Sequence, residues 1–256
     1  MASNSLALAR LNQALVNRRL VKVIAGIENH DLDHVLAVVR AAGAAGAQAV
    51  DVAADPTIVS AVLEASDLVV FASAIEPTDL ARAVDAGAHV VELGNFDGLY
   101  RRGQFPTASQ ILAWTRETRD LIGDRATLCV TISGRLPLAV QLDLARDLQA
   151  AGADLIQAEG VLGLAEGSGI HASLTAITSA LANAAEIARV VEIPVILAGG
   201  LNAENVAFAH ATGACGVGVG RSISGAGDLE AMTRSARAVV ESLTRYEHAG
   251  PALRLA

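Results

Sequence analysis

Lysine is almost missing from this chain of 256 residues. Its 19 basic residues are one lysine, Lys22, and 18 arginines. Lys22 interrupts an apolar run at 21–26 that is typical of a buried strand. A buried ammonium is costly unless it is paired or neutral, and lysine can lose its proton where arginine cannot. Codon bias accounts for the missing surface lysines but not for the position of this one, so we single out Lys22 as a candidate for chemistry.

Aromatic residues, cysteines and positive charge are also scarce. Aromatic residues make up 3% of the chain, and the net charge is −8. Both features argue against nucleic acid as a partner, because phosphates attract basic surfaces and bases stack on aromatic rings. The two cysteines, Cys129 and Cys215, lie in apolar runs and are expected to be buried, unreactive thiols. Neither lies near a cluster of metal ligands, so no metal site is expected.

Two further absences concern targeting. The first residues, 1–12, lack the basic and apolar regions of a secretory signal. No uncharged apolar stretch is long enough to span a bilayer. The sequence therefore predicts a cytoplasmic protein with no membrane partner.

Short apolar runs alternate with helix-length segments along the chain. The runs that predict strands are 21–26, 49–53, 68–73, 89–93, 127–133, 155–159, 194–198 and 216–220. The segments that predict helices are 32–42, 56–65, 77–86, 109–121, 138–150, 172–190, 203–212 and 229–245. Strict alternation of strand and helix indicates a parallel sheet, and eight such units predict a (β/α)8 TIM barrel. An open doubly wound sheet is the alternative, but the turn after the first strand lacks a glycine-rich dinucleotide motif.

The ends of the chain add little to this single domain. Helical spacing at 5–18 predicts a capping helix, within residues 1–19, that closes the bottom of the barrel. Residues 246–256 are expected to form a peripheral tail. The helical segments are rich in alanine, and such small apolar surfaces indicate self-association into a homo-oligomer.

Polar residues interrupt several of the predicted strands near their carboxyl ends, where the active groups of barrel enzymes lie. Asp51, Glu92, Gln157 and Glu159 join Lys22 in this set of catalytic candidates. If they face inward, one cation lies among carboxylates and an amide, as an interior ammonium requires. Asp51, on the neighbouring strand, is the expected direct partner of Lys22, and Glu92 is the second.

Other polar residues near the strand ends have weaker claims. Possible substrate contacts are Asn29, Ser73, Asn95, Thr131 and His171. Asp55 precedes Pro56, which predicts a helix cap rather than a ligand contact. For Thr131 and Ser133, hydrogen bonding of the hydroxyl to the backbone is the structural alternative.

The last two strands both end in glycine-rich turns. Such turns follow strands seven and eight of many barrels and bind phosphate there. Glycines expose backbone N–H groups to the anion, and an arginine adds a charge-assisted contact. The predicted phosphate-binding residues are Gly199, Gly200, Gly220, Arg221 and Ser222. Tight helix–strand packing is the structural alternative for these glycines.

The segment 160–171 follows the sixth strand and holds four glycines around an apolar centre. This composition suits a lid that closes over a ligand. An exposed loop or a contact between subunits is an equally good interpretation.

Five motifs together resemble the conserved plastid reading-frame 23 family of cyanobacteria and plastids. They are KVIAG at 22–26, VDVAADP at 50–56, SAIEP at 73–77, VELGNFD at 91–97 and QAEG at 157–160. The resemblance covers about 8–225 and implies a phosphate-binding TIM barrel similar to thiamine-phosphate synthase, thiazole synthase and the pyridoxal-phosphate synthase subunit. It implies no catalytic assignment, and the reactive lysines of pyridoxal-phosphate synthase lie on other strands.

We therefore expect an enzyme that binds a small phosphorylated carbonyl metabolite. Lys22 acts as a Schiff-base lysine in aldolase-like cleavage, condensation or cyclisation, or else as an electrostatic centre. Asp51 or Glu92 moves protons. A sugar-phosphate isomerase or epimerase, a barrel that binds flavin mononucleotide, and a non-catalytic phosphometabolite-binding protein are the alternatives; no cofactor is expected in the first interpretation.

Overall fold

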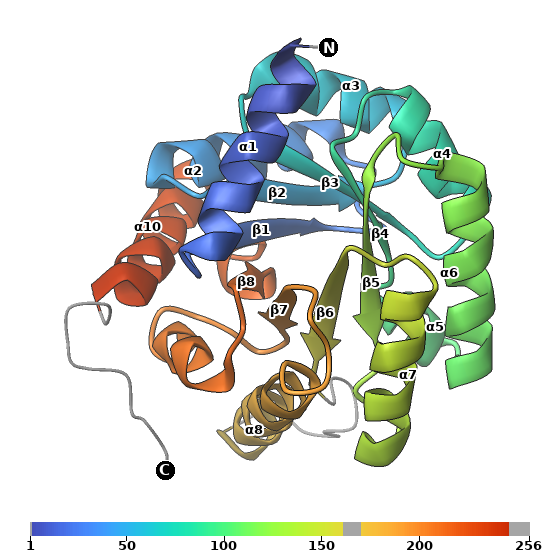
Figure 1. Cartoon of the computed structure of the whole chain (residues 1–256). Helices are drawn as coiled ribbons and strands as arrows, with labels where there is room; N and C mark the ends of the chain where they lie inside the picture. The colour runs from blue at the N-terminus through green and yellow to red at the C-terminus, as the bar shows by residue number, and fades with distance from the viewer. Residues whose placement is uncertain (1, 161–169, 246–256) are drawn as a thin grey trace.

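The chain folds into a closed barrel of eight parallel strands (Figure 1). The computed structural model describes residues 2–160 and 170–245. Each strand pairs with its neighbours in chain order, and β1 closes the barrel against β8. The strands are β1 (Leu20–Gly26), β2 (Ala49–Ala53), β3 (Val69–Ala74), β4 (Val90–Leu93), β5 (Thr127–Ile132), β6 (Leu155–Glu159), β7 (Val195–Ala198) and β8 (Gly216–Val219). The predicted (β/α)8 barrel is confirmed, with strand ends displaced by one residue at several positions.

Helices surround the barrel. They are α1 (Ala2–Val16), α2 (Leu32–Ala45), α3 (Pro56–Ala65), α4 (Pro77–Asp85), α5 (Asp97–Arg101), α6 (Ala108–Ile122), α7 (Leu138–Ala150), α8 (Ile170–Ile187), the 3-10 helix η1 (Val206–Thr212), α9 (Arg221–Ser224) and α10 (Leu229–Arg245). The described helices include none that is both long and apolar enough to cross a membrane.

One predicted helix is wrong in type and length. The segment between β7 and β8 forms the 3-10 helix η1 instead of an α-helix over 203–212. The reason is local, because the Asn202 side chain accepts the backbone N–H groups of Glu204 and Asn205. The Asn205 side chain in turn accepts the N–H of Asn202. These side-chain turns compete with helical hydrogen bonds, so regular structure starts only at Val206.

Helix ends follow the sequence signals. Asp55 caps α3 by accepting the N–H groups of Thr57 at 2.8 Å and Ile58 at 3.3 Å. Its predicted role as a cap is confirmed. Gly46 ends α2 with a φ of 81°, a left-handed conformation in which glycine has no Cβ penalty.

The capping helix α1 lies across the end of the barrel at which the strands begin (Figure 1). Its buried residues Ala7, Leu11, Ala14 and Leu15 pack on inward side chains of the strands, such as Leu20 and Phe71. Because strand side chains alternate, Lys22 and Ser73, which lie two positions after Leu20 and Phe71, also face inward. Apolar packing thus closes the end of the barrel at which the strands begin, and the polar catalytic candidates lie nearer the carboxyl ends of the strands. The predicted tail 246–256 lies outside the described residues.

Candidate functional site

The interior of the barrel holds a buried ionic cluster built around Lys22. Its Nζ donates to Asp51 Oδ2 at 3.1 Å and to Glu92 Oε2. The exposed fractions of Lys22, Asp51 and Glu92 are 0%, 2% and 0%. Both expected partners of the lysine are therefore confirmed as contacts. Removing one member of such a cluster leaves charges that are buried without compensation.

Neutral groups complete the cluster. Ser73 Oγ donates to Asp51 Oδ1, and Thr131 Oγ1 donates to Glu92 Oε1 at 3.2 Å. Gln157 Nε2 donates to the same Glu92 oxygen at 2.7 Å. Ser73 and Thr131 thus serve carboxylates within the barrel wall, rather than the backbone or an open cavity. The Lys22 ammonium also lies 4.8 Å from the centroid of the Phe71 ring, which is a cation–π contact.

The electrostatics favour a protonated lysine. Burial alone lowers the pKa of Lys22, but the carboxylates of Asp51 and Glu92 outweigh this effect and raise the pKa above its ordinary value. Burial raises the pKa of Asp51 to about 6, against the opposing attraction of Lys22 and with help from repulsion by Glu92. One cation cannot neutralise two buried carboxylates, so the excess negative charge favours uptake of a proton by Asp51.

A cavity of about 570 Å³ opens at the carboxyl ends of the strands. All five predicted phosphate-binding residues line it: Gly199, Gly200, Gly220, Arg221 and Ser222. Gly199 and Gly200 have φ angles of 106° and 72°, which favour glycine over any residue with a side chain. Arg221 is exposed, and Ser222 Oγ donates to the carbonyl of Leu201 at 3.0 Å, which joins the turns after β7 and β8. The structure therefore brings the two glycine-rich turns together around one space.

Among the catalytic candidates, Gln157 and Glu159 line this cavity, whereas Lys22, Asp51 and Glu92 are not among its lining residues. The three ionic residues lie deeper in the barrel, and Gln157 connects them to the cavity through its hydrogen bond to Glu92. Lys22 is therefore connected to the cavity with the glycine-rich turns only indirectly, through Glu92 and the side-chain amide of Gln157.

Glu159 is held by residues that the sequence did not single out. Its Oε1 accepts the hydroxyl of Tyr100 at 2.8 Å and the N–H of Gly134 at 3.4 Å. Tyr100 lies on the unpredicted helix α5, and its hydroxyl also contacts Ser133 Oγ at 2.5 Å. The signal for Tyr100 is its rarity, since the chain has only two tyrosines. Its ring in turn packs under the guanidinium of Arg135, 4.9 Å from the ring centroid.

The loop residues differ in their roles. Asn95 lines the cavity, in a left-handed conformation with a φ of 58°. Asn29 supports its own loop, because its Nδ2 lies 3.1 Å from the carbonyl of Ala25 and 2.8 Å from His34 Nδ1. His34 Nε2 lies 3.0 Å from the carbonyl of Ser224, so this contact connects α2 to α9. The segment 160–171, predicted as a lid, lies outside the described residues at 161–169, and its last two residues begin α8. His171 belongs to this helix, but its side chain lies outside the described residues.

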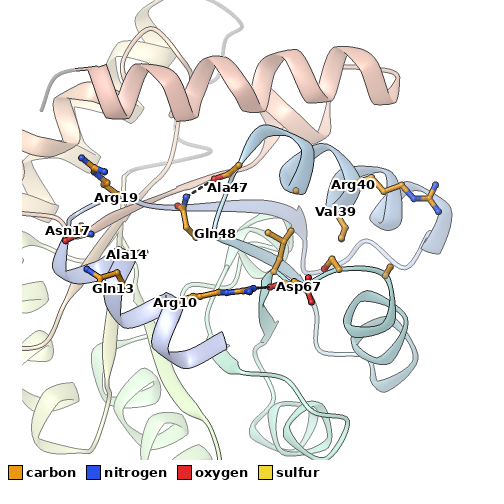
Figure 2. A pocket seen from close by; sticks show the side chains of 15 residues that line it. Arg10, Gln13, Ala14, Asn17, Arg19, Val39, Arg40, Ala47, Gln48 and Asp67 are labelled. Atoms are coloured by element: carbon orange, nitrogen blue, oxygen red, sulfur yellow. Dashed lines mark hydrogen bonds between the residues drawn. The ribbon is translucent and has the colours of Figure 1, made fainter. Parts of the chain in front are cut away.

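A larger cavity, of about 730 Å³, lies at the opposite end of the molecule between α1, α2 and the loop before β3 (Figure 2). Three arginines line it, but Figure 2 shows that they do not converge. Arg10 points to Asp67, whose carbonyl it contacts at 3.1 Å, and Arg40 points away from the rest. Volume alone therefore does not identify the functional site, and the carboxyl-end cavity holds the convergent polar groups.

Fold and site together define a (β/α)8 barrel with a ligand cavity at the carboxyl ends of its strands. The chain belongs to the family described as "Protein of unknown function (DUF561)", whose model matches residues 6–248. A relative named "Uncharacterized protein ycf23", from Cyanophora paradoxa, is 36% identical over 224 residues, which cover 87% of this chain and 92% of the relative. The resemblance to the plastid reading-frame 23 family is confirmed.

Solved structures with the same fold include two proteins whose names mention a phosphorylated compound. Thiamine phosphate pyrophosphorylase from Pyrococcus furiosus superimposes with a TM-score of 0.59 at 20% identity, covering 90% of this chain and 97% of that one. A 3-hexulose-6-phosphate synthase superimposes with a TM-score of 0.65 at 17% identity, covering 88% and 99%. At 20% and 17% sequence identity, these superpositions show that the fold is shared and nothing more.

Proposed function

We propose that this protein is an enzyme acting on a small phosphorylated carbonyl metabolite. The observation that carries the proposal is the cavity of about 570 Å³ in which both glycine-rich turns face Gln157 and Glu159. Backbone N–H groups of Gly199, Gly200 and Gly220 hold the phosphate, and Arg221 adds a charge-assisted side-chain contact. The Ser222 hydroxyl already donates its proton to Leu201, so Ser222 fixes the position of the turn. The names of the structural relatives, which mention phosphorylated compounds, support the same class of ligand.

The reacting part of the ligand then lies towards Glu159 and Gln157. Glu159 is 7% exposed and lines the cavity, so its carboxylate is the group placed to take or return a proton. Tyr100 and the N–H of Gly134 fix its position. Aldolase-like cleavage, condensation, cyclisation and isomerisation all require a proton transfer of this kind next to a carbonyl group.

Lys22 acts in this proposal as an electrostatic centre and not as a Schiff-base lysine. A Schiff base requires a neutral amine, whereas the neighbouring carboxylates raise the pKa of Lys22 and keep it charged. Its Nζ is also occupied by Asp51 and Glu92. The ammonium neutralises Glu92, which in turn orients the amide of Gln157 at the cavity floor.

Binding measurements test the phosphate site. Calorimetry with inorganic phosphate and with sugar phosphates is expected to detect binding to the wild-type protein. Arg221→Ala is expected to weaken it by about tenfold, the lower range for a charge-assisted hydrogen bond. Arg40→Ala is the matched control, since it removes one exposed arginine from the cavity at the opposite end. Equal losses in the two variants would show only a non-specific effect of charge and would overturn the site.

Borohydride trapping tests the role of Lys22. Because the chain has a single lysine, a reduced adduct formed with a sugar phosphate is confined to Lys22 or the N-terminus. If Lys22 is an electrostatic centre, intact-mass and peptide analysis are expected to find no adduct at Lys22 with a sugar phosphate that the protein converts to product. An adduct at Lys22 would replace that role with covalent catalysis. Because the proposal includes no cofactor, the purified protein is expected to be colourless, and a flavin spectrum would contradict it.

A further inference from the structure

The side-chain amide of Gln157 is satisfied at one end only. Its Nε2 donates to Glu92 Oε1 at 2.7 Å and approaches Thr131 Oγ1 at 3.3 Å. Its Oε1 is buried and has no hydrogen-bond partner among the residues that the structure describes. The whole side chain is 4% exposed, so solvent does not serve this oxygen freely. A buried carbonyl without a donor is destabilising, and each such group in a native fold needs an explanation.

The orientation of this amide is fixed by its neighbours. Turning it over would place the carbonyl oxygen against Glu92 Oε1, which already accepts the Thr131 hydroxyl. Two acceptors would then face each other without a proton between them, whereas the present orientation gives the carboxylate a donor. Lys22 holds the other oxygen of Glu92, so the carboxylate cannot readily rotate to compensate. The open end of the amide is therefore its carbonyl oxygen.

This oxygen lies beside the part of the cavity that Gly218 leaves unfilled. A Cβ at Gly218 would lie 3.0 Å from Gln157 Oε1 and 3.2 Å from Ile24 Cδ1. Gly218, Ile24 and Gln157 all line the cavity. Gly220, one of the proposed phosphate-binding residues, follows Gly218 by two positions, which corresponds to about 7 Å of extended backbone. A ligand of three to six carbon atoms with a terminal phosphate spans that interval.

The charges around the floor of the cavity define what the ligand presents there. Beneath the lining, one cation, Lys22, faces the carboxylates of Asp51 and Glu92. Glu159, in the lining itself, is a third carboxyl group. The floor is therefore rich in acceptors and has excess negative charge. A carboxylate on the ligand would be repelled there, whereas an O–H group would satisfy Gln157 Oε1.

We infer that Gln157 determines specificity by accepting a hydrogen bond from a ligand hydroxyl, and that the ligand is a polyhydroxylated phosphate rather than a carboxylated or alkyl one. The inference rests on the proposed function, because it takes the phosphate end of the ligand to lie at Gly199, Gly200, Gly220 and Arg221. What is new is the chemistry of the other end of the ligand, which carries the hydroxyl group that donates to Gln157. Gly218 leaves the space beside this acceptor free of a side chain.

Calorimetry with four probes tests the inference: inorganic phosphate, pentyl phosphate, ribose 5-phosphate and 6-phosphogluconate. The wild-type protein is expected to bind ribose 5-phosphate at least about fivefold more tightly than pentyl phosphate, which corresponds to one net hydrogen bond. It is expected to bind 6-phosphogluconate more weakly than ribose 5-phosphate. Gly218→Ala places a methyl group against Gln157 Oε1 and leaves the hydrogen bond from Nε2 to Glu92 in place. This variant is therefore expected to lose the preference and retain affinity for inorganic phosphate.

Two further variants separate recognition from folding. Gln157→Met removes the acceptor at similar size and is expected to abolish the same preference. Gly43→Ala is the matched control, because a Cβ there, in α2, meets no atom within 4 Å, and the preference is expected to persist. Binding of phosphate without any preference for ribose 5-phosphate, or a preference unchanged in folded Gly218→Ala, would overturn the inference alone. Absence of binding by every probe would overturn both it and the proposed function.

Discussion

Replacing Lys22 with methionine tests whether the buried ionic cluster is a charged unit. The change removes the ammonium and leaves Asp51 and Glu92, at 2% and 0% exposure, facing each other inside the barrel. Breaking a buried ion pair by removing one partner costs about 3–5 kcal/mol of unfolding free energy. For a chain of this size each kcal/mol lowers the melting temperature by about 2–4 °C. Lys22→Met is therefore expected to melt roughly 6–20 °C below the wild type.

The assay is thermal and urea unfolding followed by circular dichroism at pH 5 and pH 8. The loss is expected to be smaller at pH 5, because protonation of a carboxyl group relieves the unpaired charge. The control is the triple variant Lys22→Met, Asp51→Asn, Glu92→Gln, which removes all three charges and is expected to recover much of the lost stability. A Lys22→Met protein within about 1 kcal/mol of the wild type at pH 8, below the range for a buried pair, would show that the three residues do not form a charged unit.

Three other predictions concern stability. The pKa of folded Asp51, about 6, lies above its ordinary value of 3.8, so its contribution to stability is fully present below about pH 4 and is lost as the pH rises through about 6; urea unfolding is expected to show the wild type losing stability relative to Asp51→Asn between pH 4 and pH 7, and a constant difference would contradict this. Leu11→Ala, in the buried face of α1, is expected to cost about 2–5 kcal/mol, whereas Leu6→Ala, at an exposed position, is expected to change stability by at most about 0.5 kcal/mol; equal losses would remove the packing role of α1. Asp55→Ala is expected to cost about 1 kcal/mol at pH 7 through loss of the α3 cap, and no loss would show that the cap is dispensable.

Much of the barrel was predictable because its signals are local and repeated. Each strand is a short apolar run, and each helix carries its own start and end signals, such as Asp55 before Pro56. The polar interruptions also carried information, since Lys22, Asp51 and Glu92 each interrupt an apolar strand. The two-residue period shows which neighbours share their face, and the structure places that face inward. Their mutual contacts follow from closure of the barrel, which brings β1, β2 and β4 around one axis.

The remaining features depend on distances that the sequence does not contain. The depth of Lys22 below the cavity depends on the stagger of the strands, which pairs Lys22 with Ala49 and Ile24 with Asp51. Tyr100 reaches Glu159 because the short helix α5 folds back over the barrel, and five residues give too little periodicity to predict such a helix. The open end of Gln157 becomes visible only when every hydrogen bond around it is known.

A crystal structure of the protein grown with ribose 5-phosphate would show directly which cavity binds the ligand. We expect the phosphate to lie within hydrogen-bonding distance of the backbone N–H groups of Gly200 and Gly220, and a sugar hydroxyl to donate to Gln157 Oε1. A sugar phosphate bound instead at the opposite end of the barrel, in the cavity lined by Arg10, Arg19 and Arg40 (Figure 2), would contradict this expectation.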